Sequence, residues 1–394
     1  MTAILQHAER PIVPAASTSA TVATPPRPGG IALVLGTGPE IIKLAPIIRE
    51  LGDMARVVRT GRRFPQGISE VFFAEHGLTD PRSRLDLGAD ARAGRIALAL
   101  ERLDQLFAAD RPDVVLVRGA TDTALAGALA AHSNGIPLVH VEAGLRCHDL
   151  DLPEEHNRVL VDRVSDVLCA STQGNVGNLR AEGLDGRDIR LTGDTTVEAV
   201  HHRLMPERAR LNLLRKWGLE TDGYVLATLD RSENVDDEEA LFAIMSHLAE
   251  VADAGYPVVL PAPPRTRAAA IRAGVLTARM GVRVVNPLWH SEFLALARHA
   301  ALLVSDSGAV QEEATVLKRP ILVVRRSTER PEVLREFGAL VGPRDDIAGV
   351  ALSWLADGED RRAGLADLPC PFGDGHSSER IADAVRHLAL VAAR

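Results

Sequence analysis

The chain has 394 residues, of which 46% are hydrophobic and 25% charged, and its formal net charge is −8 at pH 7. This length exceeds what one hydrophobic core usually organises, so the sequence predicts two domains. The negative charge argues against a nucleic-acid-binding protein, because phosphate backbones attract basic surfaces.

The chain opens with a stretch rich in Ala, Pro, Ser and Thr. It lacks the basic-then-apolar order of a signal peptide, so we expect residues 1–28 to be a flexible leader. Ordered structure is predicted to begin at "IALVLGTGPEIIKLAPIIREL". An apolar run at 31–35 meets a glycine turn, and apolar residues at helical spacing follow from Ile41 to Leu51. This pattern indicates a strand, a loop and a helix.

The same alternation continues along the chain. "ARVVRTG", "PDVVLVRGA", "IPLVHVEAG", "SDVLCAST" and "IRLTGD" have the pattern of strands, with helical patterns between several of them. After an Arg-rich connector around residues 200–220, a second series follows, from "GYVLATLD" to "PILVVRR". Strands alternating with helices predict parallel sheets. The fold class is therefore α/β, with two doubly wound, Rossmann-like domains facing across a cleft, at 29–200 and 201–375.

Cysteines and hydropathy bear on the location of the protein. Cys147, Cys169 and Cys370 are widely separated and form no CxxC pair, which favours a reducing compartment such as the cytoplasm. No apolar run approaches the roughly 18 residues of a membrane span.

Two groups of polar residues follow the early predicted strands. Gly36 and Thr37 form a turn into a helix that carries Lys43 one turn later, which is a geometry that offers backbone N–H groups to an anion. A glycine turn before a helix is also common for structural reasons alone. Arg118 and Asp122 follow a later strand, and Asp122 has the alternative of simply complementing a helix dipole.

A third group lies in "HVEAGLRCHDLDLPEEHNR", directly after a strand. It contains Glu142, Glu154 and Glu155, together with Arg146 and Arg158. One interpretation is a surface loop with weak ion pairs. The other is an acid/base site, because a strand end facing the cleft can shift a carboxyl pKa through burial or through a neighbouring charge.

The fourth group spans two neighbouring strand ends in the second series. Ser307 and Gly308 open a helix that contains Glu312 and Glu313, which again is an anion-binding geometry. Arg330 follows the next strand. The two glutamates are also compatible with a role limited to the helix dipole.

Six segments together resemble the UDP-N-acetylglucosamine 2-epimerase family: "GTGPEIIKLAPII", "HVEAGLR", "PEEHNR", "TGDTTVEA", "SDSGAVQEEA" and "RRSTERPE". The resemblance implies the GT-B fold, with the last helix, at 376–394, crossing back onto the first domain. It implies a homodimer that binds a UDP-sugar and UDP and needs no metal or redox cofactor. The implied reaction removes the C2 proton and eliminates UDP. UDP then adds back, or water takes its place.

The resemblance also assigns roles to residues of this chain. Lys43, Glu142 and Glu154 match functional family positions, with Asp122 and Asp230 as replacements at two others. The complete predicted set comprises the catalytic candidates Lys43, Glu142, Glu154, Asp122 and Asp230, and the ligand-binding candidates Gly36, Thr37, Arg146, Arg231, Phe293, Ser307, Gly308, Glu313 and Arg330.

Three positions depart from the family pattern. Gly38 stands where the family usually has arginine, Ala120 where it has aspartate, and Asp230 where it has histidine. These changes leave two alternatives to an epimerase. One is a divergent GT-B nucleotide-sugar hydrolase or glycosyltransferase, and the other is a nucleotide-sugar-binding protein without catalysis.

Overall fold

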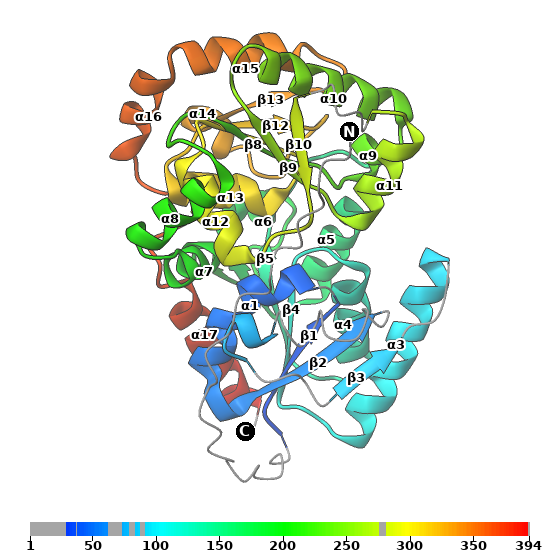
Figure 1. Ribbon diagram of the computed structural model, residues 1–394. Helices are drawn as coiled ribbons and strands as arrows, with labels where there is room; N and C mark the ends of the chain where they lie inside the picture. Colours follow the sequence, from blue (N-terminus) through cyan, green and yellow to red (C-terminus); the bar gives the residue numbers. More distant parts are fainter. Residues whose placement is uncertain are drawn as a thin grey trace.

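The structure is a computed structural model, and it describes residues 29–36, 38–61, 73–78, 83–86, 91–275 and 281–392. The predicted leader and Thr37 lie outside these residues. The described chain forms two lobes, each built around one sheet, which are stacked one above the other (Figure 1).

The first sheet has seven parallel strands in the order β3-β2-β1-β4-β5-β6-β7. Their bounds are β1 Ile31–Leu35, β2 Ala55–Gly61, β3 Ser83–Asp86, β4 Val114–Arg118, β5 Leu138–Ala143, β6 Val167–Ala170 and β7 Asp188–Leu191. The chain winds outward from β1 to β3 and then returns to place β4 beside β1. This confirms the predicted doubly wound topology, and a ligand is expected where the winding reverses, beyond the carboxyl ends of β1 and β4.

The second sheet repeats this plan with six parallel strands in the order β10-β9-β8-β11-β12-β13. Their bounds are β8 Val225–Thr228, β9 Val258–Pro261, β10 Val282–Val285, β11 Leu302–Ser305, β12 Ile321–Val324 and β13 Gly338–Val341. The central strands are continuous apolar runs, because helices cover both faces of a parallel sheet. The predicted domain limits stay a prediction; the strands of the two sheets lie at 31–191 and 225–341.

Helices cover the sheets. Those of the first series are α1 Gly38–Leu51, α3 Arg92–Ala109, α4 Asp122–Ser133, α5 Pro153–Val164 and α6 Gln173–Ala181, with a short 3-10 helix at Gly52–Met54. α7 Thr196–Arg203 and α8 Glu207–Trp217 form the connector. The second series has α9 Ser232–Val235, α10 Glu238–Asp253, α11 Pro264–Arg272, α12 His290–His299, α13 Gly308–Leu317, α14 Val333–Glu336, α15 Ile347–Ala356 and α16 Gly358–Ala366.

The last helix, α17 Ser377–Ala392, returns to the first lobe. It lies beside α1 in Figure 1. Its buried residues Ile381 and Val385 belong to the same hydrophobic core as Ile31 of β1 and Ile41 of α1. The C-terminal segment thus completes the core of the first sheet, as the resemblance implied.

The two lobes are joined by polar contacts as well as by the chain. Thr172, before α6, donates a hydrogen bond to Glu332 of the second lobe over 2.5 Å. The backbone N–H and hydroxyl of Ser291 both donate to Glu75, over 3.1 and 3.2 Å. These contacts bring the carboxyl ends of the two sheets' strands toward each other.

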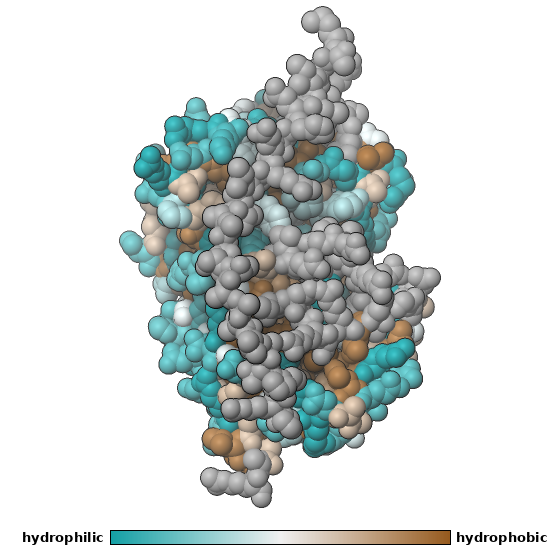
Figure 2. All heavy atoms as spheres, turned by 60° about the horizontal axis from the view of Figure 1, so that its bottom comes forward, coloured by the Kyte–Doolittle hydropathy of each residue, from teal (hydrophilic) through white to brown (hydrophobic). Residues whose placement is uncertain are grey.

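The coloured surface is mostly hydrophilic on the face drawn in Figure 2, with hydrophobic residues in small groups. Of the helices in the described part of the chain, none combines the length and the hydrophobicity that a membrane crossing requires.

A close backbone approach after β5 gives a testable prediction. Gly144 has φ +79°, and a Cβ there would lie 2.3 Å from the backbone oxygen of Asn175. We expect Gly144→Ala to lower the free energy of unfolding by at least about 2 kcal/mol. The new Cβ would overlap the backbone oxygen of Asn175, which cannot move aside as the end of a flexible side chain could. Urea unfolding followed by circular dichroism measures this change.

Gly135→Ala is the matched control. Gly135 also has a positive φ, +58°, but a Cβ there would meet no atom within 4 Å. It should therefore cost only the roughly 1 kcal/mol of a left-handed alanine. Equal losses in the two variants would contradict the steric argument.

Candidate active site

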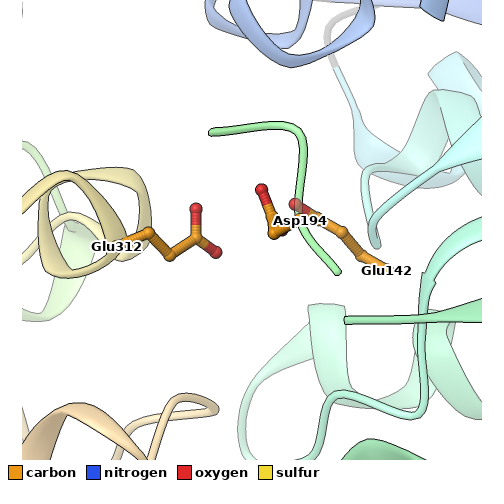
Figure 3. A group of neighbouring side chains, drawn as sticks. All are labelled: Glu142, Asp194 and Glu312. Carbon is orange, nitrogen blue, oxygen red and sulfur yellow. The ribbon is translucent and has the colours of Figure 1, made fainter. Parts of the chain in front are cut away.

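A cluster of buried charged side chains lies where the two sheets approach each other. Its carboxylates are Glu142 from the end of β5, Asp194 from the loop between β7 and α7, and Glu312 from α13. In Figure 3, Glu312 points toward Asp194 and Glu142 from the opposite side. One ligand oxygen from each of the three lies within 4.8 Å of the others.

The ammonium group of Lys43 holds these carboxylates together. Lys43 lies in the second turn of α1, and its side chain is only 3% exposed. Its Nζ lies 3.1 Å from Oδ2 of Asp194 and is in direct contact with Glu142 and Glu312. Burial alone would lower the pKa of Lys43, but Asp194, Glu142 and Glu312 together raise it above its ordinary value. Lys43 is therefore charged at neutral pH.

Glu142 has an unusual backbone conformation for its residue type. Its φ is +68°, and the register between β5 and β6 shifts on either side of it. A non-glycine residue in this region costs on the order of 1–3 kcal/mol, and such strain is concentrated at functional sites. The strained turn directs the side chain to Lys43 and to Nη2 of Arg118, which lies 2.6 Å from Oε1.

The charge state of Glu142 follows from these two cations. Burial on its own would raise the pKa of Glu142, but Arg118 and Lys43 outweigh burial and hold that pKa well below its ordinary value. Glu142 is therefore a carboxylate at neutral pH, and it is able to accept a proton. A ligand anion that drew either cation away would raise the pKa of Glu142 and make it a stronger base.

Asp194 is fixed by its own backbone and by neighbouring donors. Its N–H donates to the carbonyl of Phe372 over 2.7 Å. The backbone N–H of Thr196 donates to Oδ1 over 2.8 Å, and the Ser171 hydroxyl donates to Oδ2 over 3.3 Å. The carboxylate is thus held in one orientation before any ligand binds.

Glu312 reaches the cluster from the second lobe. Its Oε2 accepts the hydroxyl of Thr196 over 2.8 Å, and its Oε1 lies 2.5 Å from Nε of Arg330. Burial raises the pKa of Glu312; Asp194 and Glu142 add to that increase, and Arg330 and Lys43 oppose it. Among the cluster's carboxyl groups, Glu312 is therefore better suited than Glu142 to carry a proton.

The charges in the cluster balance. Three carboxylates (Glu142, Asp194 and Glu312) meet three cations (Lys43, Arg118 and Arg330). The same carboxylates have the spacing to hold a metal ion. The ammonium of Lys43 already contacts all three, so a metal ion would have to displace it.

A second, arginine-rich cluster adjoins the first through Arg330. Its centre is the buried carboxylate of Glu329, which contacts Arg330 and lies 2.7 Å from Nη1 of Arg325. Arg158 and Arg231 approach to 3.8 Å. Burial would raise the pKa of Glu329, but the surrounding guanidinium groups hold it well below its ordinary value.

Gly308 makes the close packing of this region possible. A Cβ at Gly308 would lie 2.4 Å from Nη1 of Arg330 and 3.1 Å from Oε1 of Glu329. The N-terminus of the ten-residue helix α13 therefore lies directly against the arginine-rich cluster. Helix N–H groups and guanidinium groups both favour anions, so this side of the site is suited to a phosphate.

Of the predicted catalytic residues, the structure brings Lys43 and Glu142 together and places the other three outside their cluster. Glu154 is half-buried in the first turn of α5 and interacts electrostatically with Arg231. Asp122 opens α4, where it is paired with Arg92 over 2.8 Å. Asp230 is exposed after β8.

Arg146 lies in a different network from the two clusters. Its Nε is 2.7 Å from Glu182, its Nη2 is 2.7 Å from Asp162, and its Nη1 donates to the carbonyl of Leu145. Asp162 also contacts Nδ1 of His140 over 2.6 Å. All three guanidinium nitrogens are thus engaged with groups that lie outside the two clusters.

Other predicted ligand-binding residues surround the site in different roles. The N–H of Gly36 donates to Glu40 over 2.6 Å, so a carboxylate of the chain itself occupies this glycine turn. Ser307 is the residue before α13, and it makes no side-chain cap. Glu313 of α13 accepts from His290, and Phe293 of α12 packs against the core of the second lobe.

The predicted site set missed three central residues: Arg118, Asp194 and Glu312. Each had a signal in the sequence. Asp194 lies in "TGDTTVEA", one of the segments that carried the resemblance; Arg118 ends a strand; and Glu312 precedes the chosen Glu313. Strand ends indicate that such residues lie near a site, but only the packing of α7 against α1 and α13 identifies the ones that meet Lys43.

Comparison with known proteins shows the relatives of this chain. The family model for UDP-N-acetylglucosamine 2-epimerase matches residues 49–386. The UDP-N-acetylglucosamine 2-epimerase of Methanocaldococcus jannaschii is 35% identical over 362 residues, covering 89% of this chain and 97% of that protein. A UDP-2,3-diacetamido-2,3-dideoxy-D-glucuronate 2-epimerase of Pseudomonas aeruginosa is 32% identical, covering 91% of this chain and 99% of that protein.

A similar solved structure is that of Methanocaldococcus jannaschii UDP-GlcNAc 2-epimerase in complex with UDP-GlcNAc and UDP. It has a TM-score of 0.81 and 33% sequence identity, covering 91% of this chain and 99% of that one. The similarity extends over both lobes, because it spans nearly all of the described chain.

Three carboxylates share the ammonium group of Lys43, and this leads to a prediction about how stability depends on pH. In Lys43→Met, three buried carboxylates lose a cation, so we expect a loss of about 3–5 kcal/mol in the free energy of unfolding at pH 7. Without Lys43, the folded-state pKa values of Glu142 and Glu312 move upward, so the variant gains stability relative to wild type as the pH falls through them. The difference from wild type should therefore shrink at pH 5, as measured by urea unfolding at both pH values.

Lys216→Met is the control for loss of a lysine, since Lys216 is exposed on α8. It should change the stability by less than about 0.5 kcal/mol at either pH. If Lys43→Met were destabilised equally at pH 7 and pH 5, the carboxylates would not depend on Lys43 for their charge.

Proposed function

The chain belongs to the UDP-N-acetylglucosamine 2-epimerase family, and we propose that it inverts C2 of a UDP-linked 2-acetamido sugar. The observation that carries this proposal is the Lys43 cluster, in which an ionised carboxylate at a strained backbone position adjoins an arginine-rich region. A C2 proton is weakly acidic, so its removal needs a fixed base together with stabilisation of the departing diphosphate. In this proposal, the Lys43 cluster provides the base, and the arginine-rich cluster stabilises the departing diphosphate.

The proposed first half-reaction proceeds by elimination. A carboxylate, for which Glu142 is our first candidate, takes the C2 proton, and the electrons of the C2–H bond form a C1–C2 double bond. The bond from C1 to the diphosphate oxygen breaks, and UDP leaves with its electron pair. In the second half-reaction, C2 receives a proton on the opposite face, and UDP adds back at C1. Addition of water instead would release the free sugar.

We propose that Arg231 and the N-terminus of α13 receive the diphosphate. Arg231 is the more exposed partner in the arginine-rich cluster, with 29% of its side chain exposed. Burial lowers the pKa of Arg231, and neighbouring Arg325 adds to this effect. An arriving dianion would relieve this repulsion between cations. Glu154, which interacts with Arg231, is then placed to exchange a proton on the diphosphate side of the sugar.

UDP-N-acetylglucosamine is our first choice of substrate. The two named relatives act, by their names, on sugars that share the uridine diphosphate and the C2 acetamido group. The sugar named for the second relative differs from the first because it carries a second acetamido group and a carboxylate. Gly38, Ala120 and Asp230 are the positions at which this chain departs from the family pattern, so the hydrolysing and non-hydrolysing outcomes are both tested below.

We also propose a homodimer in the cytoplasm. The family resemblance supports the dimer, and three free cysteines, Cys147, Cys169 and Cys370, are compatible with a reducing compartment. Light scattering of the purified protein would distinguish a dimer from a monomer.

Proton NMR in D₂O tests the reaction directly. With UDP-N-acetylglucosamine, we expect the C2 proton signal to disappear as solvent deuterium enters the sugar. UDP-N-acetylmannosamine would mark the non-hydrolysing outcome, and free N-acetylmannosamine with UDP the hydrolysing one. If no exchange occurs with this substrate or with UDP-2,3-diacetamido-2,3-dideoxy-D-glucuronate, although UDP binds, the chain is not a C2 epimerase of either sugar.

Glu142→Gln tests the assignment of the base. It should reduce C2 exchange by about 10³-fold or more while changing the affinity for UDP less than about threefold, since it removes a base and not a phosphate contact. Glu379→Gln, an exposed carboxylate on α17, is the control and should retain full activity. Normal exchange in Glu142→Gln would move the role of base to another carboxylate.

A further inference from the structure

A buried histidine–glutamate pair lies outside the Lys43 cluster, in the second lobe. His290 is the first residue of α12, and its Nε2 lies 2.8 Å from Oε1 of Glu313 in α13. Both side chains are buried, with no more than 5% exposed. His290 is the sole hydrogen-bond donor to Glu313 among the residues that the structure describes.

This contact defines which ring nitrogen of His290 donates a hydrogen bond. Because a carboxylate accepts, the hydrogen in this contact is on Nε2 of His290, which leaves Nδ1 as the other ring nitrogen that needs a partner. That Nδ1 is buried and has no hydrogen-bond partner within the described ranges. His76 lies next to it, with ring centroids 5.7 Å apart, and Nε2 of His76 is likewise buried without a partner. Burial and His290 lower the pKa of His76 to about 4, so His76 adds no charge here at neutral pH.

The carboxylate of Glu313 has unused capacity for hydrogen bonds. A carboxylate has about four acceptor positions, and one donor leaves most of them free. These free acceptor positions can take hydrogen bonds from hydroxyl groups of a ligand. Phe293, one helical turn after His290, provides an aromatic neighbour on the same helix, and the N-terminus of α13 lies one turn before Glu313.

We propose that His290 is a positioning residue that fixes the carboxylate of Glu313 to accept the hydroxyl groups of a nucleoside ribose. This inference rests on the proposed function, because it takes the nucleotide to be UDP. A single N–H donor at Oε1 holds the carboxylate in one rotamer and leaves Oε2 to the ribose. His290 thereby determines the preference for a ribonucleotide without contacting the reacting carbon atoms.

Calorimetric titration with UDP and with 2′-deoxyuridine diphosphate tests the proposal. Wild type should prefer UDP by about tenfold or more, the value of one well-placed hydrogen bond to a charged group. In His290→Phe, the affinity for UDP should fall about tenfold while that for the deoxynucleotide changes little, so the preference approaches one. His290→Gln, whose amide also donates, should restore part of the preference.

Kinetics provide a second readout. In His290→Phe, KM for the UDP-sugar should rise in step with the loss of UDP affinity, with kcat changed by less than about twofold, because the ribose is remote from C2. His387→Phe, an exposed histidine on α17, is the control and should leave both affinities unchanged.

The outcomes separate this inference from the proposed function. A folded His290→Phe protein, verified by circular dichroism, that keeps the wild-type preference for UDP would overturn the inference and reduce the pair to a structural contact. Failure of wild type to prefer UDP over the deoxynucleotide would overturn the inference as well. If the same protein still exchanged the C2 proton, the proposed function would stand. Failure of wild type to bind UDP at all would overturn both.

Discussion

The ammonium group of Lys43 is the interaction on which the site depends. It comes from α1, the first helix in the described part of the chain, and meets carboxylates from three distant segments, one of which belongs to the second lobe. Without that cation, three buried carboxylates within a few ångströms of one another would be left with only Arg118 and Arg330 to balance them, which is costly in a buried site. The same contact therefore joins the lobes and determines the protonation state of the site.

Backbone geometry places these charges. Glu142 occupies the left-handed region at +68°, where its side chain turns from the sheet toward Lys43. Gly119 and Gly193 have positive φ values in the neighbouring loops. Gly308 allows Arg330 to approach the start of α13. Side chains at strand ends would otherwise spread over the surface, and these few backbone positions make them converge.

The two charged clusters have different electrostatic characters. Around Lys43 the charges balance, which leaves carboxylates able to exchange protons without attracting a further anion. Around Glu329, guanidinium groups gather whose other partners include Glu155 and Glu233, so an added anion meets several charged donors there. Because Arg330 contacts both Glu312 and Glu329, charge brought to the second cluster is felt by the first. Under the proposed function, a diphosphate bound at the second cluster would therefore affect proton transfer at the first.

The sequence by itself determined the parallel α/β architecture, the two sheets and the segments near the site, because apolar periodicity and strand-end motifs are local properties. It gave no sign of β3, whose "SRLD" has no apolar run, and it did not reveal that Arg146 contacts Asp162 and Glu182. Which carboxylates meet Lys43, and that Glu313 meets His290, was decided only by the tertiary structure. Such pairings join residues far apart in the chain, and their pKa values depend on burial and distances that no local pattern encodes.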